Sequence, residues 1–560
     1  IVDSVYTDAT GIVKTVSDSH VSGFENVSAA AEEKSSIKAI SGSFAFGGQA
    51  AVGGAVAYNE ITGKTGAHMN NIAVDAKNVL IKGVNDADIW TMASGCGGSG
   101  EVAVQGAATT GEISRTVAAG MDNVSASKTD SFVDILAEST GEINSNATVA
   151  AVGVGVAGVG AGVVVNRLSD TISSSVSGTT LNVKDLEVRA KGSQTIRAFG
   201  VAGAGGAYAG VSGSVAVNII NNAVNALIKG NTSVTAEDNI GVVAQSDETL
   251  LNYAGIVSGG LVGVGAGLSV NDIQGDTNAC IENSTVKAMG KNAGISLKNE
   301  ISDTAMNDAF IDDTTVNAQY TLEKSRISST KTGLVVDSSA THTLKSFVAN
   351  AAAGGGGIAG TVNVSRISGT TGARISNTRI NNGATGDVSV NAGDYSNLSG
   401  FVGSAGLGGT GVGIAADTGM VNRTTSAKLD GIVSDATSSS TARNVSVKAD
   451  AKLGISAVDA GLAVGAGGNA IAGTLATNIM QSNTEAIVNN ANITLKSLGV
   501  NATHKAKTSI AAGAVSASLY GSLGGSLGVN SVKDLVKAEI TGSNIIMQSN
   551  GSGKFEVQAL

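Results

Sequence analysis

The sequence contains no proline, although average usage of about 5% would give roughly 28 in a chain of 560 residues. Proline removes a backbone N–H from a sheet and is confined to edge strands, first positions and bulges. Its absence therefore indicates a backbone that is hydrogen-bonded to neighbouring strands along most of its length.

Large and charged side chains are also scarce. The chain has 17 aromatic residues, 14% charged residues and 77 glycines, so a core built on bulky side chains is excluded and small residues must stack closely. The net charge is −10 and the sequence has no long basic run. Because nucleic-acid binding needs clustered lysine and arginine, we expect no nucleic-acid partner.

Motifs for metals and cofactors are missing as well. Cys96 and Cys280 lie 184 residues apart and are predicted to be free thiols, because they are too distant to bridge in a linear stack. The four histidines have no second ligand at metal spacing, and the Gly-Gly-x-Gly runs lack the aspartate of a calcium-binding roll. The sequence has no phosphate loop and no nucleophile elbow. We expect no catalytic residue, no cofactor and no metal.

What the chain does contain is a repeat of about 52 residues. A Gly/Ala/Val tract ends at a polar mark, a small residue follows eight positions later, and an apolar residue stands two positions after that. This small-variable-apolar pattern predicts a strand with one buried face, and places the variable residue, Cys280 in one copy, on the outside. The marks are Asn59, Asn166, Asn218, Asn271, Ser365, Asp417, Asn478 and Asn530, with a weaker copy around Gln105. The copy at Asp417 needs ten positions rather than eight to reach its small residue, Ala427.

The repeat predicts an all-β chain, because helix signals are nearly absent and glycine, threonine, serine, asparagine and valine favour strands or turns. Strands at a fixed period predict one continuous parallel β-solenoid over residues 1–560, with a right-handed β-helix as the expected form. We expect two coils of about 26 residues in each repeat, and thus a rod on the order of 100 Å long. Three smaller coils per repeat remain an alternative. Both ends fall inside a repeat, so we expect a segment of a longer polypeptide.

The recurring asparagines are predicted to set the register of the coils. Asparagine tolerates the left-handed turn conformation, and its amide can bond to the equivalent amide one coil above or below. We therefore expect a stacked polar ladder at a corner of the solenoid. The predicted register residues are Asn59, Asn166, Asn218, Asn271, Asn478 and Asn530.

The 94-residue interval between Asn271 and Ser365 is the main irregularity. Residues 303–346 are predicted to be an irregular or truncated repeat without a Gly-rich tract of its own, and to bulge from the side of the stack as a lateral elaboration. They include the densest group of charged residues, which consists of Asp303, Asp308, Asp312, Asp313, Lys324 and Arg326.

The Gly-rich tracts are predicted to be buried strands. Residues 147–165 are uncharged and long enough for a membrane span, but five glycines make a poor helix and comparable tracts recur along the chain. The alternation of valine and glycine slips at Ala157, which predicts a bend between two strands. Since both faces are small or apolar, each tract is expected to pack against a second layer of the same chain or against another protomer.

The Gly-rich tract, the Val-Asn mark and strands of the form V-x-A-x-x-N-I-x-V-x-A, as in residues 234–244, resemble the repeat regions of filamentous-haemagglutinin-type adhesins. The resemblance covers most of the chain. It implies a right-handed β-helix, a large bacterial surface protein, and export through an outer-membrane partner or as an autotransporter.

The function expected from the repeat and the resemblance is that of a secreted bacterial surface adhesin or stalk, extracellular and without catalysis. Its partner would be an unidentified glycan or protein on a host or neighbouring cell. One alternative is a self-assembling extracellular fibre or sheath subunit with the Gly-rich strands at the contact between protomers. A third hypothesis is a β-helix enzyme acting on polysaccharides, which would need clustered carboxylates beside a cation in a groove.

Overall fold

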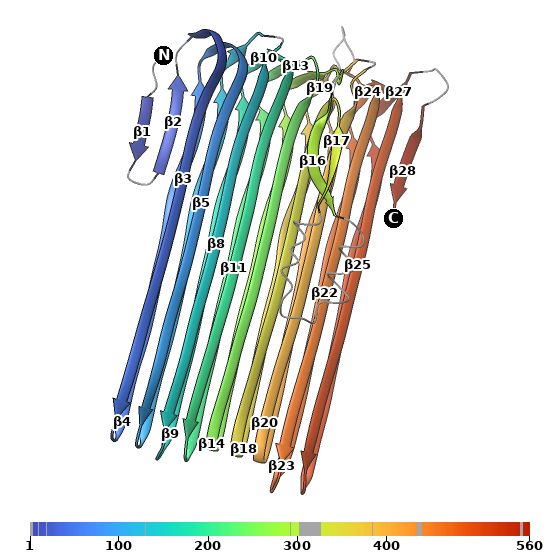
Figure 1. Cartoon of the computed structure of the whole chain (residues 1–560). Coiled ribbons are helices and arrows are strands. Elements are labelled where there is room, and N and C mark those ends of the chain that lie inside the picture. The colour runs from blue at the N-terminus through green and yellow to red at the C-terminus, as the bar shows by residue number, and fades with distance from the viewer. Residues whose placement is uncertain are drawn as a thin grey trace.

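The computed structural model describes the chain except residues 1–3, 9–10, 18–19, 129, 292, 302–325, 384, 434–439 and 549–552. The described residues form strands and turns only, and they include no helix long and apolar enough to cross a membrane. Long parallel strands lie side by side in a stack, with the two termini on opposite sides (Figure 1). The prediction of an all-β parallel solenoid is confirmed.

Each coil consists of a long strand, a tight turn, a second long strand that runs back, and a short strand at a corner. The first long strands form sheet I, which contains β3 (His20–Gly47), β5 (Ala73–Ser99), β8 (Phe132–Gly153), β11 (Asp185–Gly206), β22 (Asn444–Gly465), β25 (Ser497–Ser518) and β28 (Phe555–Ala559). The returning strands form sheet II, which contains β4 (Ala50–Asn70), β6 (Val102–Asp122), β9 (Ala157–Ser177), β12 (Ala209–Lys229), β23 (Asn469–Asn489) and β26 (Gly521–Thr541).

Three strands run through the turn and so belong to both sheets: β14 (Ile240–Glu282), β18 (Leu334–Ser376) and β20 (Val388–Asp430). The short strands are β7 (Ser125–Ala126), β10 (Thr180–Val183), β13 (Ser233–Ala236), β15 (Thr285–Ala288), β19 (Arg379–Ile380), β21 (Ser440–Thr441), β24 (Asn492–Leu495) and β27 (Asn544–Met547). They gather at one end of the coils, which we call the short-strand end, and the tight turns lie at the other, the turn end (Figure 1).

One repeat makes one coil, so the prediction of two 26-residue coils is wrong. Leu186 of β11 pairs with Ile240 of β14, and Ala50 of β4 pairs with Val102 of β6, so each strand lies beside its equivalent one full repeat away. Small inward side chains let the two sheets lie face to face, so one repeat is divided mainly between two long strands. Each long strand has about 22 residues and is roughly 70 Å long. The nine coils of sheet II in the described chain rise about 40 Å. This segment is a broad flattened blade rather than a 100 Å rod.

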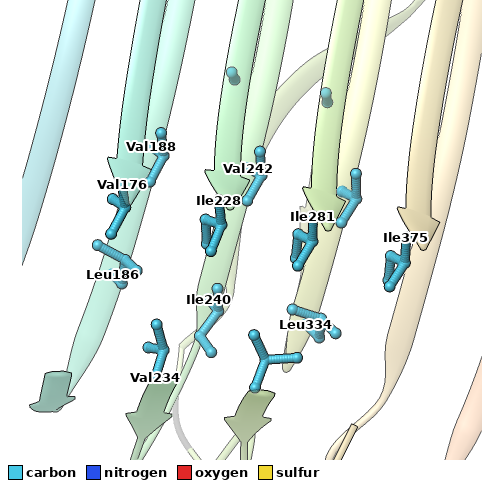
Figure 2. Packing of buried hydrophobic residues seen from close by; sticks show 14 of the residues in the cluster. Val176, Leu186, Val188, Ile228, Val234, Ile240, Val242, Ile281, Leu334 and Ile375 are labelled. Carbon is cyan, nitrogen blue, oxygen red and sulfur yellow. The ribbon is translucent and has the colours of Figure 1, made fainter. Parts of the chain in front are cut away.

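The interior alternates between apolar and polar layers along the strands. At the short-strand end, three strand walls enclose a core of valine, isoleucine, leucine and alanine, including Ile228, Val234 and Ile240 (Figure 2). Beyond a polar layer follows a stack of isoleucine and leucine such as Ile143, Leu168, Ile196 and Ile220. A second polar layer separates that stack from small residues near the turn end.

The repeat pattern of small and apolar residues is confirmed in register. Ala226 lies between Ser174 and Ala279, and Ile228 lies between Val176 and Ile281, all of them buried. The bend predicted at Ala157 is also present, because β8 ends at Gly153 and β9 begins at Ala157. Residues 147–165 thus form the end of β8, the turn and the start of β9. Each Gly-rich tract packs its inner face against a second layer of the same chain.

Additional residues occur between β15 and β18. Two strands, β16 (Ile295–Ile301) and β17 (Arg326–Lys331), pair antiparallel in a separate sheet, and Ile295 and Leu297 pack against Val335 and Val243 on the outside of sheet I. Of the predicted irregular repeat 303–346, residues 303–325 lie outside the described residues. Residues 334–346 begin β18, which continues into its own Gly-rich tract, so this part is a regular coil and the prediction of a truncated repeat is wrong there. Near the N-terminus, β1 (Ser4–Asp8) pairs antiparallel with β2 (Gly11–Ser17), which lies beside β4.

Candidate functional site

The predicted register asparagines lie inside the blade, in the second polar layer, which we call the Asn layer. The Asn166 Nδ2 donates to Asn218 Oδ1 at 2.8 Å, and Asn218 Nδ2 donates to Asn271 Oδ1 at 3.0 Å. All three are buried, as are Asn59 and Asn478, whereas Asn530 is exposed in the last coil. The amide ladder is therefore present, but it is a mid-strand interior ladder and not a corner ladder.

Two marks were placed in the wrong register. Asp417 pairs with Asn363, and the partner of Ser365 is Gly419, which lies eight positions before Ala427. Likewise the residue beside Asn59 is Gly111, not Gln105, and Ala119 follows it at eight positions. Both errors have one cause: residues an even number of positions apart on a strand, two for Asp417 and six for Gln105, face the same side, so burial alone does not separate them.

The corners are built from a different set of residues, which sequence reasoning missed. Twelve positions after each true mark stands asparagine or glycine with positive φ, as at Asn71 (φ 52°) and Gly431 (φ 64°). Only these two residue types adopt this conformation readily. The set is Asn71, Asn123, Gly178, Gly230, Asn283, Asn377, Gly431, Asn490 and Gly542.

Replacing Gly431 by valine should lower the free energy of unfolding by about 1–3 kcal/mol, because a β-branched side chain is strained at φ 64°. Thermal unfolding followed by circular dichroism measures the loss. Gly431→Asn is the matched control and should stay near the parent protein, and equal losses for both variants would contradict the assignment of this corner.

The first polar layer carries buried charges, and we call it the ionic layer. Arg115 donates to Asp170 through Nη2 at 2.6 Å and Nε at 3.1 Å, and its Nη1 bonds Asn85 Oδ1 at 2.7 Å. Gln194 Nε2 donates to Asp170 Oδ2 at 3.0 Å from the facing sheet. The Arg115 and Asp170 side chains are completely buried.

Further along the ionic layer, four ionisable side chains are linked in a row across three coils. Glu248 Oε2 lies 2.8 Å from His342 Nε2, His342 Nδ1 lies 3.8 Å from Asp394 Oδ1, and Arg423 Nη2 lies 2.6 Å from Asp394 Oδ2. Arg423 Nη1 also donates to the carbonyl oxygens of Gly275 and Ser368, at 2.7 Å each. Glycine is required at position 275, beside these four side chains, since a Cβ atom there would lie 2.7 Å from His342 Nε2.

These contacts set the pKa values of the two carboxylates. Burial alone raises the pKa of Asp394, but attraction to Arg423 and His342 outweighs it and holds that pKa below its usual value. Burial is likewise outweighed for Glu248, chiefly by His342, so its pKa is lowered. The four side chains are sealed from solvent, and they link the coils that contain β14, β18 and β20.

The outer face of sheet II at the turn end is apolar. Three columns of outward side chains run along the stack: an outer ridge, a groove and an inner ridge. The outer ridge is Val52, Val104, Val159, Val211, Val264, Ile358, Val412, Ile471 and Leu523. The groove is Gly54, Gly106, Ala161, Gly213, Ala266, Gly360, Ile414, Gly473 and Gly525. The inner ridge is Val56, Ala108, Val163, Val215, Leu268, Val362, Ala416, Leu475 and Leu527.

The groove has physical depth where its neighbours are large. An open depression of about 610 Å³ lies between Ile414, Ile471, Gly473, Leu523 and Leu527. Ile414 is the only large residue within the groove itself, and interrupts it at β20. The depression is lined by leucine, isoleucine, alanine and glycine, with Thr474 and Ser526 as its polar members, and so suits a mainly apolar occupant.

The outer face of sheet I is apolar in the same half of the blade. Phe199, Tyr253, Phe347 and Phe401 stand in one column on adjacent coils. The Phe347 and Phe401 rings are stacked at 4.6 Å with 5° between their planes, and Tyr253 lies 6.5 Å from Phe347. Because stacked rings cover one another's faces, this column is poorly suited as a sugar platform.

The outward charged side chains of the strands lie in the other half, and Glu101 is an exposed charge in a tight turn at the turn end. The outward charged side chains of the short-strand half pair between neighbouring coils, as in Arg366 with Asp272 at 2.8 Å and Arg374 with Glu282 at 3.1 Å. At the turn end, the three columns of sheet II contain no charged residue. The blade is therefore amphipathic along its width, with an apolar half that is two sheets thick.

The structure also places the cysteines and part of the charged group that were singled out from the sequence. Both cysteines are free thiols, as predicted. Cys280 belongs to an outward column, yet its neighbours cover it, and burial raises the pKa of its thiol, opposed by Arg374. Within the described residues, no three histidine, cysteine or acidic side chains gather at metal-binding distance. Of the charged group considered for an enzyme, Asp303, Asp308, Asp312, Asp313 and Lys324 lie outside the described part of the chain.

Comparison with known proteins gives no relative. No family model, curated protein or solved structure matches this chain.

Proposed function

We propose that this chain is a structural β-solenoid of a bacterial surface adhesin or stalk, which works through a broad apolar surface rather than through a catalytic pocket. One observation carries the proposal: the outward columns of sheet II at the turn end are uncharged in every coil, while charge gathers at the short-strand end. Apolar patches larger than a few hundred Å² mark interaction sites on soluble proteins.

The ionic layer and the Asn layer support the structural part of this proposal. Buried polar ladders penalise any slip between coils, because a slip would leave buried charges and amides unpaired. The stack therefore holds its outer columns in line over about 40 Å. A stiff support with a continuous adhesive strip fits a stalk that is exported to the cell surface and meets a protein or glycan of another cell.

Replacing Val211 and Val215 together by lysine should weaken adsorption of the purified chain to a methyl-terminated monolayer several-fold, because both side chains belong to the apolar ridges of β12. Adsorption is measured on a quartz-crystal microbalance, with a hydroxyl-terminated monolayer as reference. The matched control is Asn221→Lys with Asn225→Lys, which adds the same charge to the same face of the same strand, in the charged half. Equal losses in both double variants, or no preference for the methyl surface, would contradict an apolar adhesive surface.

A further inference from the structure

The outer face of sheet II is not a flat apolar surface, because it has two ridges with a groove between them. Its two ridges are lined by valine, isoleucine, leucine and alanine, and the column between them is glycine or alanine in every coil except at Ile414. Successive columns lie about 6.6 Å apart along a strand. The outer ridge of one such strip therefore fits the groove of a second, identical strip.

We propose that this face binds a second copy of the chain, with the outer ridge of each copy seated in the groove of the other. The inference rests on the proposed function only in that both use the apolar half of the blade. It adds the identity of the occupant and the geometry of the contact.

The available area is sufficient for a stable pair. The three columns above and the outward column beside the turn, which begins with Ala50 and Val102, span nine coils about 4.8 Å apart. With columns about 6.6 Å apart they give roughly 1,000 Å² per copy. Two copies would bury roughly 2,000 Å² in total, which exceeds the roughly 1,600 Å² of a standard stable interface. Charged side chains are absent from these columns, so little polar surface loses its hydration on contact.

The distribution of charge selects the orientation. A two-fold axis parallel to the coil axis brings the apolar halves into overlap and sends the two charged halves in opposite directions. The same operation places the outer ridge opposite the groove at equal height, so Val211 of one copy lies against Gly213 of its partner. An axis along the strands would instead set ridge on ridge, and charged half on charged half.

A lipid surface is a less suitable occupant. The net charge of −10 disfavours anionic headgroups, and the columns that border the apolar half mix both signs, as in Glu60, Glu112, Arg167, Asp272 and Arg366. Membrane-associated surfaces are usually flanked by lysine and arginine. Lipid binding is therefore treated as an outcome that would overturn the proposal.

The test fills the groove without removing its apolar character. A Cβ atom at Gly360 meets no atom within 4 Å and one at Gly213 meets its nearest at 3.8 Å, so Gly213→Leu with Gly360→Leu is tolerated within one chain. Ala223→Leu is the matched control, because it enlarges an outward residue of β12 in the charged half. Sedimentation velocity of the complete 560-residue chain measures association over a concentration series.

The expected result is self-association of the parent and of Ala223→Leu at micromolar concentration, weakened about ten-fold or more by the two groove substitutions. Both variants should still adsorb to the methyl-terminated monolayer, so failure of the pairing and failure of the apolar adhesive surface remain distinguishable. In a background with Cys96→Ser and Cys280→Ser, a chain with Val211→Cys mixed with a chain with Gly213→Cys should form a disulfide on oxidation. A parent chain that stays monomeric, groove variants that associate like Ala223→Leu, or a monomer that sediments with phosphatidylcholine vesicles would each overturn the proposal.

Discussion

Replacing Arg423 by methionine should lower the free energy of unfolding by about 3–5 kcal/mol, because it leaves the carboxylate of Asp394 buried without its counter-charge. Arg423 also donates to the carbonyl oxygens of Gly275 and Ser368 and to Thr371 Oγ1 at 2.9 Å, and these buried acceptors would lose their partner. Urea unfolding followed by circular dichroism and tryptophan fluorescence measures the change.

Two further variants separate charge burial from a loss of packing. Arg443→Met removes a partly exposed arginine that pairs with Asp387 in the connections just before β22 and β20, and it should cost less than about 1 kcal/mol. Combining Arg423→Met with Asp394→Asn should restore part of the loss, since a neutral amide no longer needs a counter-charge. The role assigned to the ionic layer is wrong if Arg423→Met stays within about 1 kcal/mol of Arg443→Met.

Replacing Asp459 by asparagine should stabilise the protein at pH 8, by up to about 4 kcal/mol, and should have little effect near pH 4. Asp459 faces inward, is 2% exposed, and lies between Val402 and Ala512 of the neighbouring coils. Burial, and then repulsion from Asp417, raises the pKa of Asp459 to about 7, and burial raises that of Asp417 to about 6.

Proton binding determines the direction in which the stability changes with pH. Between pH 4 and pH 7 the folded chain keeps a proton on Asp459 that the unfolded chain has lost, so stability falls as the pH rises through this window. Glu248 and Asp394 act in the opposite sense, because their lowered pKa values stabilise the fold above pH 4 to 5 and that contribution is lost in acid. The stability of the blade therefore reflects two opposed groups of buried carboxylates.

Thermal midpoints of the parent and of Asp459→Asn at pH 4.5 and pH 8 decide this prediction. Asp272→Asn provides the control, because Asp272 pairs with Arg366 on the outer face. A stabilisation of equal size at both pH values would show that the gain arises from packing and not from the raised pKa of Asp459.

The period, the all-β fold and the buried faces could be predicted from sequence because a strand side chain alternates with a period of two. Ala226 and Ile228 illustrate this, since their small and apolar equivalents recur in each coil at a constant spacing from the mark. The spacing rule was also the better guide to register. Applied at Ala427, it would have selected Gly419 over Asp417, whereas the preference for a polar mark selected the wrong residue.

The shape of the coil could not be predicted, because the sequence pattern does not say how far apart two strand walls lie. Small residues such as Gly200 and Ala202 let both long strands face each other across a thin interior, and this makes one coil of a repeat that could have made two. The ionic layer was missed for a related reason. Arg115 and Arg423 sit at inward positions, where charge is unexpected unless the partner is already known. Asp170 lies beside Arg115 on the next strand, and Asp394 faces Arg423 from the sheet I part of β20.

The apolar surface became visible only when the register was known. Val211 and Gly213 are ordinary members of a Gly-rich tract, and neither indicates which of its neighbours is inward. Once each strand is aligned with the next, the same residues separate into ridge and groove.

The tight turns and the short-strand end differ in how much they accept change in chain length. Turns such as Gly206–Ala209 and Ser99–Val102 hold two residues between strands, while the large insertion between β15 and β18 enters beside the short strands. Chain length therefore varies at the short-strand end, while the turn end keeps nearly constant turns. For protein engineering, the short-strand end is the place to graft a foreign epitope, and the turn end is the one to leave untouched.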